Sequence, residues 1–78
     1  MLRKQLTELG LTKYEVDAYL CILKQGIAEA GLIYKEAKIP YGKIYETLNS
    51  LVIKGLLEVQ NTRPKKYMAK KAKTALNE

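Results

Sequence analysis

The stretch that decides the fold is IPYGKIYETLNSLVIKGLLEV, residues 39–59. Pro40 suits the start of a helix, because its φ angle is already near the helical value and its missing N–H has no partner in a first turn. Apolar residues then return at the spacing of one helix face, at Ile44, Leu48, Leu51 and Val52. This pattern predicts a helix over about residues 40–54 that ends at Gly55.

Beyond Gly55 the apolar residues alternate, which is typical of strands. We predict two short strands, over residues 56–61 and 66–70, joined by a turn at 61–65. Tyr67 falls on the inner face of the second strand, so we assign it to the core rather than to a binding surface. The result is a β-hairpin with a basic tip.

Upstream, the clearest helix start lies at Thr12, because Thr12 and Glu15 have the spacing of a capping box. The Thr12 hydroxyl is expected to accept from the Glu15 backbone N–H, and the Glu15 carboxylate from the Thr12 N–H. The helix is expected to end at Gly26 and to include Cys21 as a small core residue rather than a reactive thiol. Its predicted core face consists of Val16, Tyr19, Leu20 and Leu23.

Two shorter helices are predicted on either side of this one. Leu2, Leu6 and Leu9 share one face of a segment over residues 2–9. A second segment over about residues 29–37 is weaker, because Gly31 in a helix interior costs about 1 kcal/mol relative to alanine. Residues 27–28 are expected to form a brief extended link before it.

This order of elements indicates a winged helix-turn-helix. Two helices joined by a tight turn place the second helix in the major groove of DNA. A basic hairpin after that helix corresponds to the wing. We therefore predict a mainly α fold with a small β-hairpin, as one domain over residues 1–78, with a recognition helix at about 40–54 and a wing at about 56–70.

The positive charge is concentrated at one end of the chain. The 78 residues contain 14 Lys plus Arg and 8 Asp plus Glu, a formal net charge of +6. Residues 61–78 alone contain six of the bases and one of the acids. Such asymmetry favours a polyanionic partner, although a solvated lysine-rich tail is the alternative.

The composition excludes several classes of site. The chain has no His and one Cys, so zinc sites built on Cys and His, Ser-His-Asp triads and internal disulfides are excluded. Carboxylates are scattered, and no glycine-rich phosphate loop exists. We expect no catalytic site, no metal, no cofactor and no membrane span, and a cytoplasmic location.

Three strings carry a family resemblance: LGLTKYEVDAYLCILKQG at residues 9–26, IPYGKIYETLNSLVIKGLLEV at 39–59, and RPKKYMAK at 63–70. Together they resemble the N-terminal winged-helix domain of TrmB-type transcriptional regulators, which are common in archaea. The likeness runs over about residues 9–69 without a gap. Regulators of the MarR and ArsR type share the architecture more loosely.

The resemblance places nine residues at a DNA-binding surface. On the recognition helix they are Tyr41, Gly42, Lys43, Tyr45, Glu46 and Asn49. On the wing they are Arg63, Lys65 and Lys66. For each residue the alternative is an ordinary solvated side chain, and the two tyrosines also lie near the edge of the apolar stripe.

These residue types suit different parts of a duplex. Lys43 suits a base edge or a phosphate, and Glu46 and Asn49 suit cytosine and adenine edges. The two tyrosines suit a sugar or a thymine methyl group. Arg63 suits a narrow minor groove, and the wing lysines suit phosphates.

The chain departs from the family pattern at three places. Lys38 stands where the family usually has a turn glycine, so strain is expected there if the position needs a positive φ. Tyr41 and Gly42 stand where an Arg-Ser pair is common, so this helix lacks a guanine-reading arginine. Ile53 replaces a charged residue and is predicted to point away from the core.

We therefore predict sequence-specific binding of double-stranded DNA by a small transcriptional regulator that acts as a homodimer. The dimer interface is expected to use the 2–9 helix, the C-terminal segment or Ile53. The large effector-sensing region of TrmB-type proteins does not fit in 78 residues, so no small-molecule effector domain is expected. The alternatives are a winged-helix module that binds protein, and RNA binding through the same charge.

Overall fold

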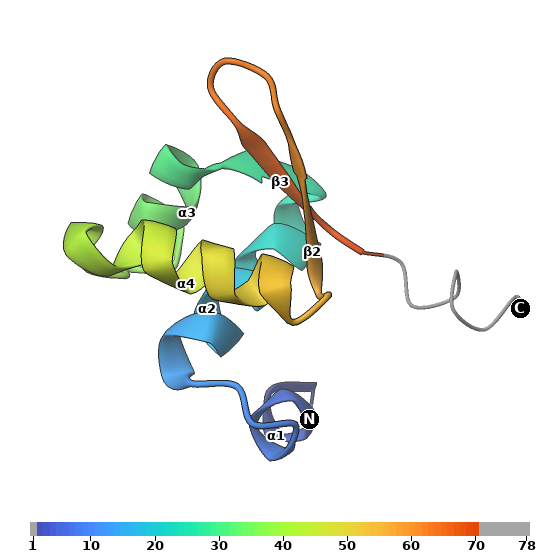
Figure 1. The fold of residues 1–78 in the computed structure, drawn as a ribbon. Helices are drawn as coiled ribbons and strands as arrows, with labels where there is room; N and C mark the ends of the chain where they lie inside the picture. The colour runs from blue at the N-terminus through green and yellow to red at the C-terminus, as the bar shows by residue number, and fades with distance from the viewer. Residues whose placement is uncertain (1, 71–78) are drawn as a thin grey trace, which may run out of the picture.

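Four helices and three strands succeed one another in the computed structural model, which describes residues 2–70 (Figure 1). Their bounds are α1 Leu2–Glu8, α2 Lys13–Gln25, β1 Ile27–Glu29, α3 Ala30–Glu36, α4 Tyr41–Ile53, β2 Leu57–Gln60 and β3 Lys66–Ala69. The predicted class, mainly helical with a small antiparallel β element, is confirmed. The C-terminal segment beyond residue 70, which was predicted as one possible dimer surface, lies outside the described residues.

The capping box that begins α2 is confirmed. The Thr12 N–H donates to Glu15 Oε1 at 2.8 Å, and the Glu15 N–H donates to the Thr12 hydroxyl at 3.2 Å. The helix ends at Gly26, whose φ of 86° lies in the region that favours glycine. Both ends of α2 are therefore set by local chemistry that the sequence displays.

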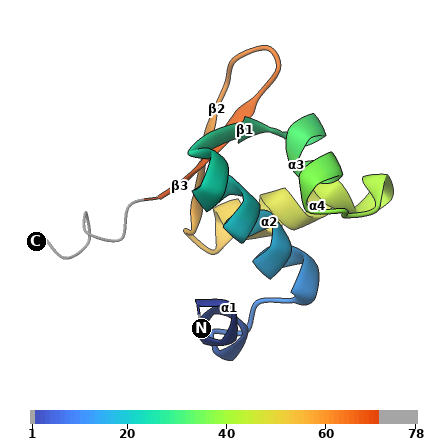
Figure 2. The same cartoon turned by 180° about the vertical axis from the view of Figure 1, so that it is seen from behind.

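The predicted core face of α2 is partly wrong. Leu23 is 42% exposed, whereas its neighbour Ile22 and the small Ala18 are fully buried. The reason is that α2 contacts α1, α3, α4, β1 and β3, so its buried side is set by several neighbours rather than by its own apolar period. Figure 2 shows α2 crossing between α1 and the sheet.

The predicted stripe on α1 is also partly wrong. Leu6 is buried, but Leu9 is 71% exposed. The helix ends at Glu8, so Leu9 already lies in the turn at Gly10, whose φ is 97°, and not on the helix face. Arg3 of α1 forms an ion pair with Asp17 of α2, which connects the two helices, and Lys13 of α2 pairs with the same carboxylate.

The sheet contains one strand more than the sequence predicted. The strand order is β1–β3–β2, and both pairings are antiparallel. The link predicted at residues 27–28 is the edge strand β1, in which Ala28 lies opposite Tyr67. Tyr67 is buried, as predicted, because it lies between Ala28 and Val59 in the centre of the sheet.

The turn between α3 and α4 positions the second helix. Lys38 has φ 57°, so the strain expected at this non-glycine position is present. Ile39 is buried, and Pro40 caps α4 rather than forming its first residue. The buried side of α4 consists of Ile44, Thr47, Leu48 and Leu51. Val52 is half-buried, and Ile53 is 75% exposed, as predicted.

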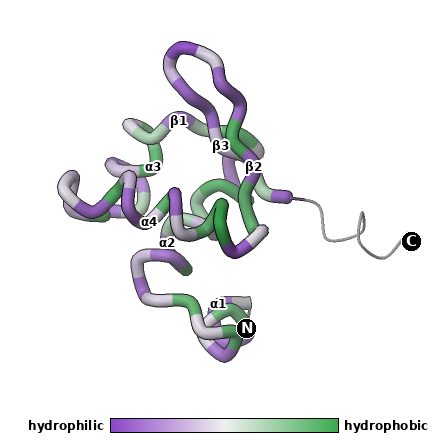
Figure 3. Tube along the Cα trace, in the orientation of Figure 1, coloured by the Kyte–Doolittle hydropathy of each residue, from purple (hydrophilic) through white to green (hydrophobic). Residues whose placement is uncertain are grey.

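Hydropathy separates the helices from the hairpin. Figure 3 shows hydrophobic segments where the helices and strands meet and mostly hydrophilic residues at the tip of the β2–β3 hairpin. In Figure 1 this hairpin extends away from the helices, so we call residues 57–69 the wing. Within residues 2–70, no helix is both long enough and apolar enough to cross a membrane.

Candidate nucleic-acid interface

The side of α4 opposite its buried residues is fully exposed. Gly42, Tyr45, Glu46 and Asn49 follow the spacing i, i+3, i+4, i+7, which places them on one helix face. We call these four residues the outward face of α4. Tyr41 and Lys43 are also exposed and flank it. All six residues predicted on the recognition helix are therefore open to solvent.

Three tyrosines form an aromatic series at the start of α4. The rings of Tyr34 and Tyr41 lie 5.3 Å apart at 83°, and those of Tyr41 and Tyr45 lie 6.3 Å apart at 87°. Such edge-to-face pairs contribute about 0.5–1.5 kcal/mol beyond area burial. Tyr41 and Tyr45 remain 63% and 56% exposed. The contact between the half-buried Tyr34 of α3 and Tyr41 was not predicted. The only sign of it in the sequence is that Tyr34 is aromatic and lies seven residues before Tyr41.

The wing loop presents the predicted cations to solvent. Arg63 and Lys65 are exposed on the loop between β2 and β3, whereas Lys66 is half-buried on β3. The Thr62 hydroxyl donates to the Pro64 carbonyl at 2.7 Å, which gives this loop an internal hydrogen bond. Ion pairs within residues 2–70 involve Arg3, Lys13 and Lys54, and no wing cation is among them.

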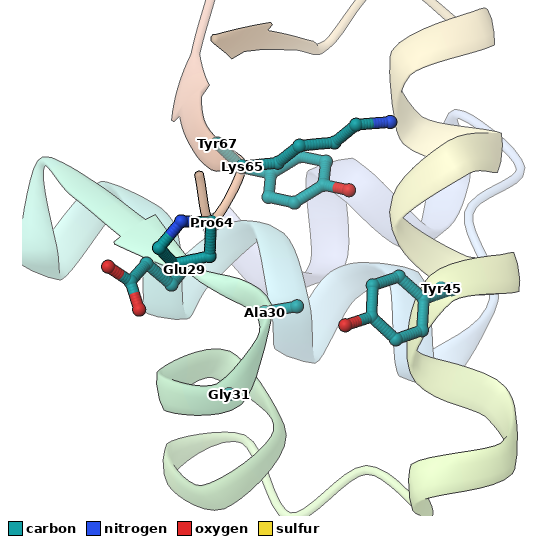
Figure 4. Close-up of a pocket in the computed structure, with 7 residues that line it drawn as sticks. All are labelled: Glu29, Ala30, Gly31, Tyr45, Pro64, Lys65 and Tyr67. Carbon is teal, nitrogen blue, oxygen red and sulfur yellow. The ribbon is translucent and has the colours of Figure 1, made fainter. Parts of the chain in front are cut away.

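A groove joins the wing to α4 (Figure 4). It has a volume of about 280 Å³ and is lined by Glu29, Ala30, Gly31, Tyr45, Pro64, Lys65 and Tyr67. The Lys65 side chain extends over the Tyr67 ring with its ammonium toward α4, and the Glu29 carboxylate points away from Tyr45. The groove thus brings one wing cation beside the outward face of α4.

The two tyrosines of this groove can donate hydrogen bonds. Burial raises the pKa of Tyr67, and the neighbouring Tyr45 raises it further. The Tyr67 phenol is therefore protonated at neutral pH, as an unperturbed tyrosine is. Phenol and ammonium donors in one groove suit an anionic oxygen such as that of a phosphate.

A buried carboxylate connects α4 to α2. Glu15 is almost fully buried, accepts from Lys54 Nζ at 2.8 Å and 3.0 Å, and accepts from the Ser50 hydroxyl. Burial alone would raise its pKa, but the hydrogen bonds from Lys54, Ser50 and Thr12 together hold the pKa of Glu15 below its ordinary value. This cluster was not predicted from the sequence, because Glu15 lies 35 and 39 residues from Ser50 and Lys54.

Cys21 behaves as the small core residue that was predicted. It is half-buried and packs against the core. Burial raises the pKa of its thiol, and the charge of Glu36 raises it further. A thiol with a raised pKa is a poor nucleophile at neutral pH.

The sequence profile of the family described as "Sugar-specific transcriptional regulator TrmB" matches residues 6–73. This chain belongs to the TrmB family. The prediction of a TrmB-type domain is therefore confirmed, and the match includes α2, the outward face of α4 and the wing. The TrmB family is one of transcriptional regulators, which are not a class of enzyme.

Two curated relatives of this TrmB-type chain cover most of its length. One is the HTH-type sugar sensing transcriptional regulator TrmBL1 of Pyrococcus furiosus, 42% identical over 64 residues, which are 82% of this chain and 19% of that protein. Another is the uncharacterized protein YrhO of Bacillus subtilis, 37% identical over 68 residues, which are 87% of this chain and 25% of that protein. The chain thus spans about a quarter or less of these relatives.

A solved structure supports the winged-helix interpretation of the TrmB-type fold. The structure of TrmBL2, described as an archaeal chromatin protein with a novel mode of DNA binding, superposes with a TM-score of 0.82 at 25% identity. The likeness covers 96% of this chain and 30% of that protein. The predicted winged-helix class is confirmed by this match.

Proposed function

We propose that this chain binds double-stranded DNA and acts in transcription regulation as the DNA-binding module of a TrmB-type regulator. The observation that carries the proposal is the groove that Tyr45 of α4 and Lys65 of the wing both line. A helix-turn-helix reads base edges from the start of its second helix, while flanking cations hold phosphates. One duplex can contact both elements. We also propose a cytoplasmic location, where the chain would meet chromosomal DNA.

The proposed sites follow from this arrangement. The bases are read by exposed residues in the first nine positions of α4, namely Tyr41, Gly42, Lys43, Tyr45, Glu46 and Asn49. The phosphates or the minor groove are held by Arg63, Lys65 and Lys66. The DNA binding named for TrmBL2 and the role of transcriptional regulator named for TrmBL1 support the proposal through their similarity to this chain.

Selection of bound sequences from a random duplex pool tests sequence-specific binding. We expect enrichment of a consensus made of two half-sites about one helical turn apart, because one small module makes few base contacts and a dimer doubles them. If duplexes are recovered at low salt but no sequence is enriched among them, the chain binds DNA without specificity. No recovery at any salt would contradict DNA binding and favour the module that binds protein.

The homodimer is a separate part of the proposal. Ile53 and Leu9 are the most exposed large apolar side chains among the described residues, and such side chains are candidates for an interface. Sedimentation equilibrium at high micromolar concentration should show a dimer. Ile53→Ser should leave the unfolding temperature of the dilute, monomeric chain nearly unchanged, because the side chain is exposed there, and should shift the equilibrium at high concentration toward monomer. A wild-type chain that remains monomeric contradicts the dimer.

A further inference from the structure

The five glycines of the chain fall into two groups. Gly10, Gly26 and Gly55 have φ values of 97°, 86° and 83°, which other residues rarely adopt. Gly31 and Gly42 lie inside α3 and α4, and neither has a positive φ. Backbone conformation therefore explains the first group and not the second.

Packing within the chain does not explain Gly31 and Gly42 either. A Cβ atom built at either position has no heavy atom within 4 Å. Alanine would fit both sites without displacing a neighbour, and alanine favours a helix more than glycine does. Within the described chain, nothing requires these two residues to be glycine, and both lower the stability of their helices.

The two glycines lie where the chain faces the proposed duplex. Gly31 lines the groove between the wing and α4, beside Tyr45 and Lys65 (Figure 4). Gly42 belongs to the outward face of α4, with Glu46 one turn further along. A glycine without a conformational or packing role allows a ligand to approach the main chain closely.

We propose that Gly31 and Gly42 are the two points at which bound DNA lies directly against the protein main chain. Gly31 meets the sugar-phosphate backbone, because Lys65, the cation that lines the same groove, suits phosphate oxygens. Gly42 meets base-pair edges, because it lies in the first turn of the recognition helix. This inference rests on the proposed DNA binding and deepens it.

The test compares Gly31→Ala and Gly42→Ala in two measurements that should move in opposite directions. Each substitution should raise the unfolding temperature by about 2–6 °C, because it removes chain entropy from the unfolded state and adds helix propensity. Each should also weaken duplex binding roughly tenfold, the effect of forcing one extra methyl group into a close contact. Fluorescence anisotropy on labelled duplexes of mixed sequence measures the affinity.

The two variants should differ in their sequence dependence. Gly31→Ala should lower the affinity for all duplexes by a similar factor, since phosphates are common to all sequences. Gly42→Ala should change the ranking of duplexes, which repeated selection from a random pool would reveal. Gly10→Ala is the matched control, because its positive φ predicts a lower unfolding temperature with unchanged affinity of the folded protein.

Two results would overturn the inference. Variants that are more stable and bind DNA as tightly as the wild type would show that no close contact occurs at these positions. Variants that lose both stability and affinity would show that the glycines serve the fold itself. A wild-type chain that fails to bind any duplex removes the proposed function as well, whereas binding by the wild type with unchanged variants removes only this inference.

Discussion

The outward face of α4 and the wing differ in charge although they border the same groove. The outward face contains one acid, Glu46, and one base, Lys43, flanks it; the other residues there are uncharged. The wing loop has Arg63 and Lys65 without an acid. Attraction to phosphate depends on net positive charge, whereas base readout depends on the placement of donors, acceptors and apolar groups. If the chain binds DNA as proposed, the wing should supply affinity and α4 should supply preference.

Removing the wing cations should have the largest effect. The double variant Arg63→Ala with Lys65→Ala should weaken duplex binding roughly hundredfold, since two charge-assisted contacts contribute about 1.5–3 kcal/mol each at most. The slope of log affinity against log salt should become shallower by about 2 per subunit. Titrations over a range of salt measure both, and the consensus selected from a random pool should stay the same.

The control for the wing variant is Lys4→Ala, which removes an exposed cation on α1. It should leave the salt slope close to that of the wild type. An equal loss of affinity in the control would mean that total charge, rather than the wing, determines binding.

Loss of the Glu15 charge should have the next largest effect. It should weaken the attachment of α4 to α2 and leave the wing unchanged. Glu15→Gln should lower the free energy of unfolding by about 2 kcal/mol, because the hydrogen bonds from Lys54 and Ser50 lose their charged acceptor. The stability that Glu15 contributes is fully present above the ordinary pKa of 4.5 and is lost as the pH falls through its lowered pKa.

Denaturant titrations at a series of pH values, from neutral down into the acid range below the ordinary pKa of Glu15, measure the contribution. The variant should lose less stability on acidification than the wild type. Glu8→Gln, on an exposed site of α1, is the matched control and should change stability by no more than about 0.5 kcal/mol. If the free energy of unfolding changed with pH in the same way in the wild type and in Glu15→Gln, the Glu15 carboxylate would not be a source of this stability.

Truncation of Tyr45 should have the smallest of these effects and should be confined to preference. An aromatic side chain on the outward face of α4 is placed to contact the C5 methyl group of thymine. The wild type should bind alternating poly(dA-dT) about fivefold more tightly than poly(dA-dU), which lacks that methyl group, and Tyr45→Ala should abolish the difference.

Tyr14→Ala on α2 serves as the control for Tyr45→Ala, since Tyr14 is not in the aromatic series of α3 and α4. The wing double variant should keep the discrimination between the two polymers at lower overall affinity. Loss of discrimination in the wing variant would contradict the division between affinity and preference.

Local chemistry made most of the helices predictable. The Thr12 capping box and the apolar spacing of α4 gave the position of both long helices, because the relevant contacts lie within four residues. The alternation around Tyr67 likewise predicted the wing. Candidate site residues on α4 could be identified by their distance from the apolar stripe and by family resemblance.

Contacts between distant residues were not predictable in the same way. The strand β1 has only three residues, too few for a period, and is defined by its pairing with β3. The hydrogen bonds from Lys54 and Ser50 to Glu15 join the end of α4 to α2. In the sequence, Lys54 and Ser50 look like ordinary surface residues and Glu15 looks like part of a helix cap, so nothing links them. Leu23 was assigned to the core because its helix was considered alone, while α2 is buried by several neighbours.

The salt dependence of duplex binding by the wild-type chain tests the central claim most directly. If a dimer contacts six to eight phosphates, the slope of log affinity against log salt should be roughly −5 to −7. A slope in this range supports a charged wing that holds the DNA backbone beside a nearly neutral reading helix. A slope near zero would contradict the account, because the wing cations would then make no contact with phosphate.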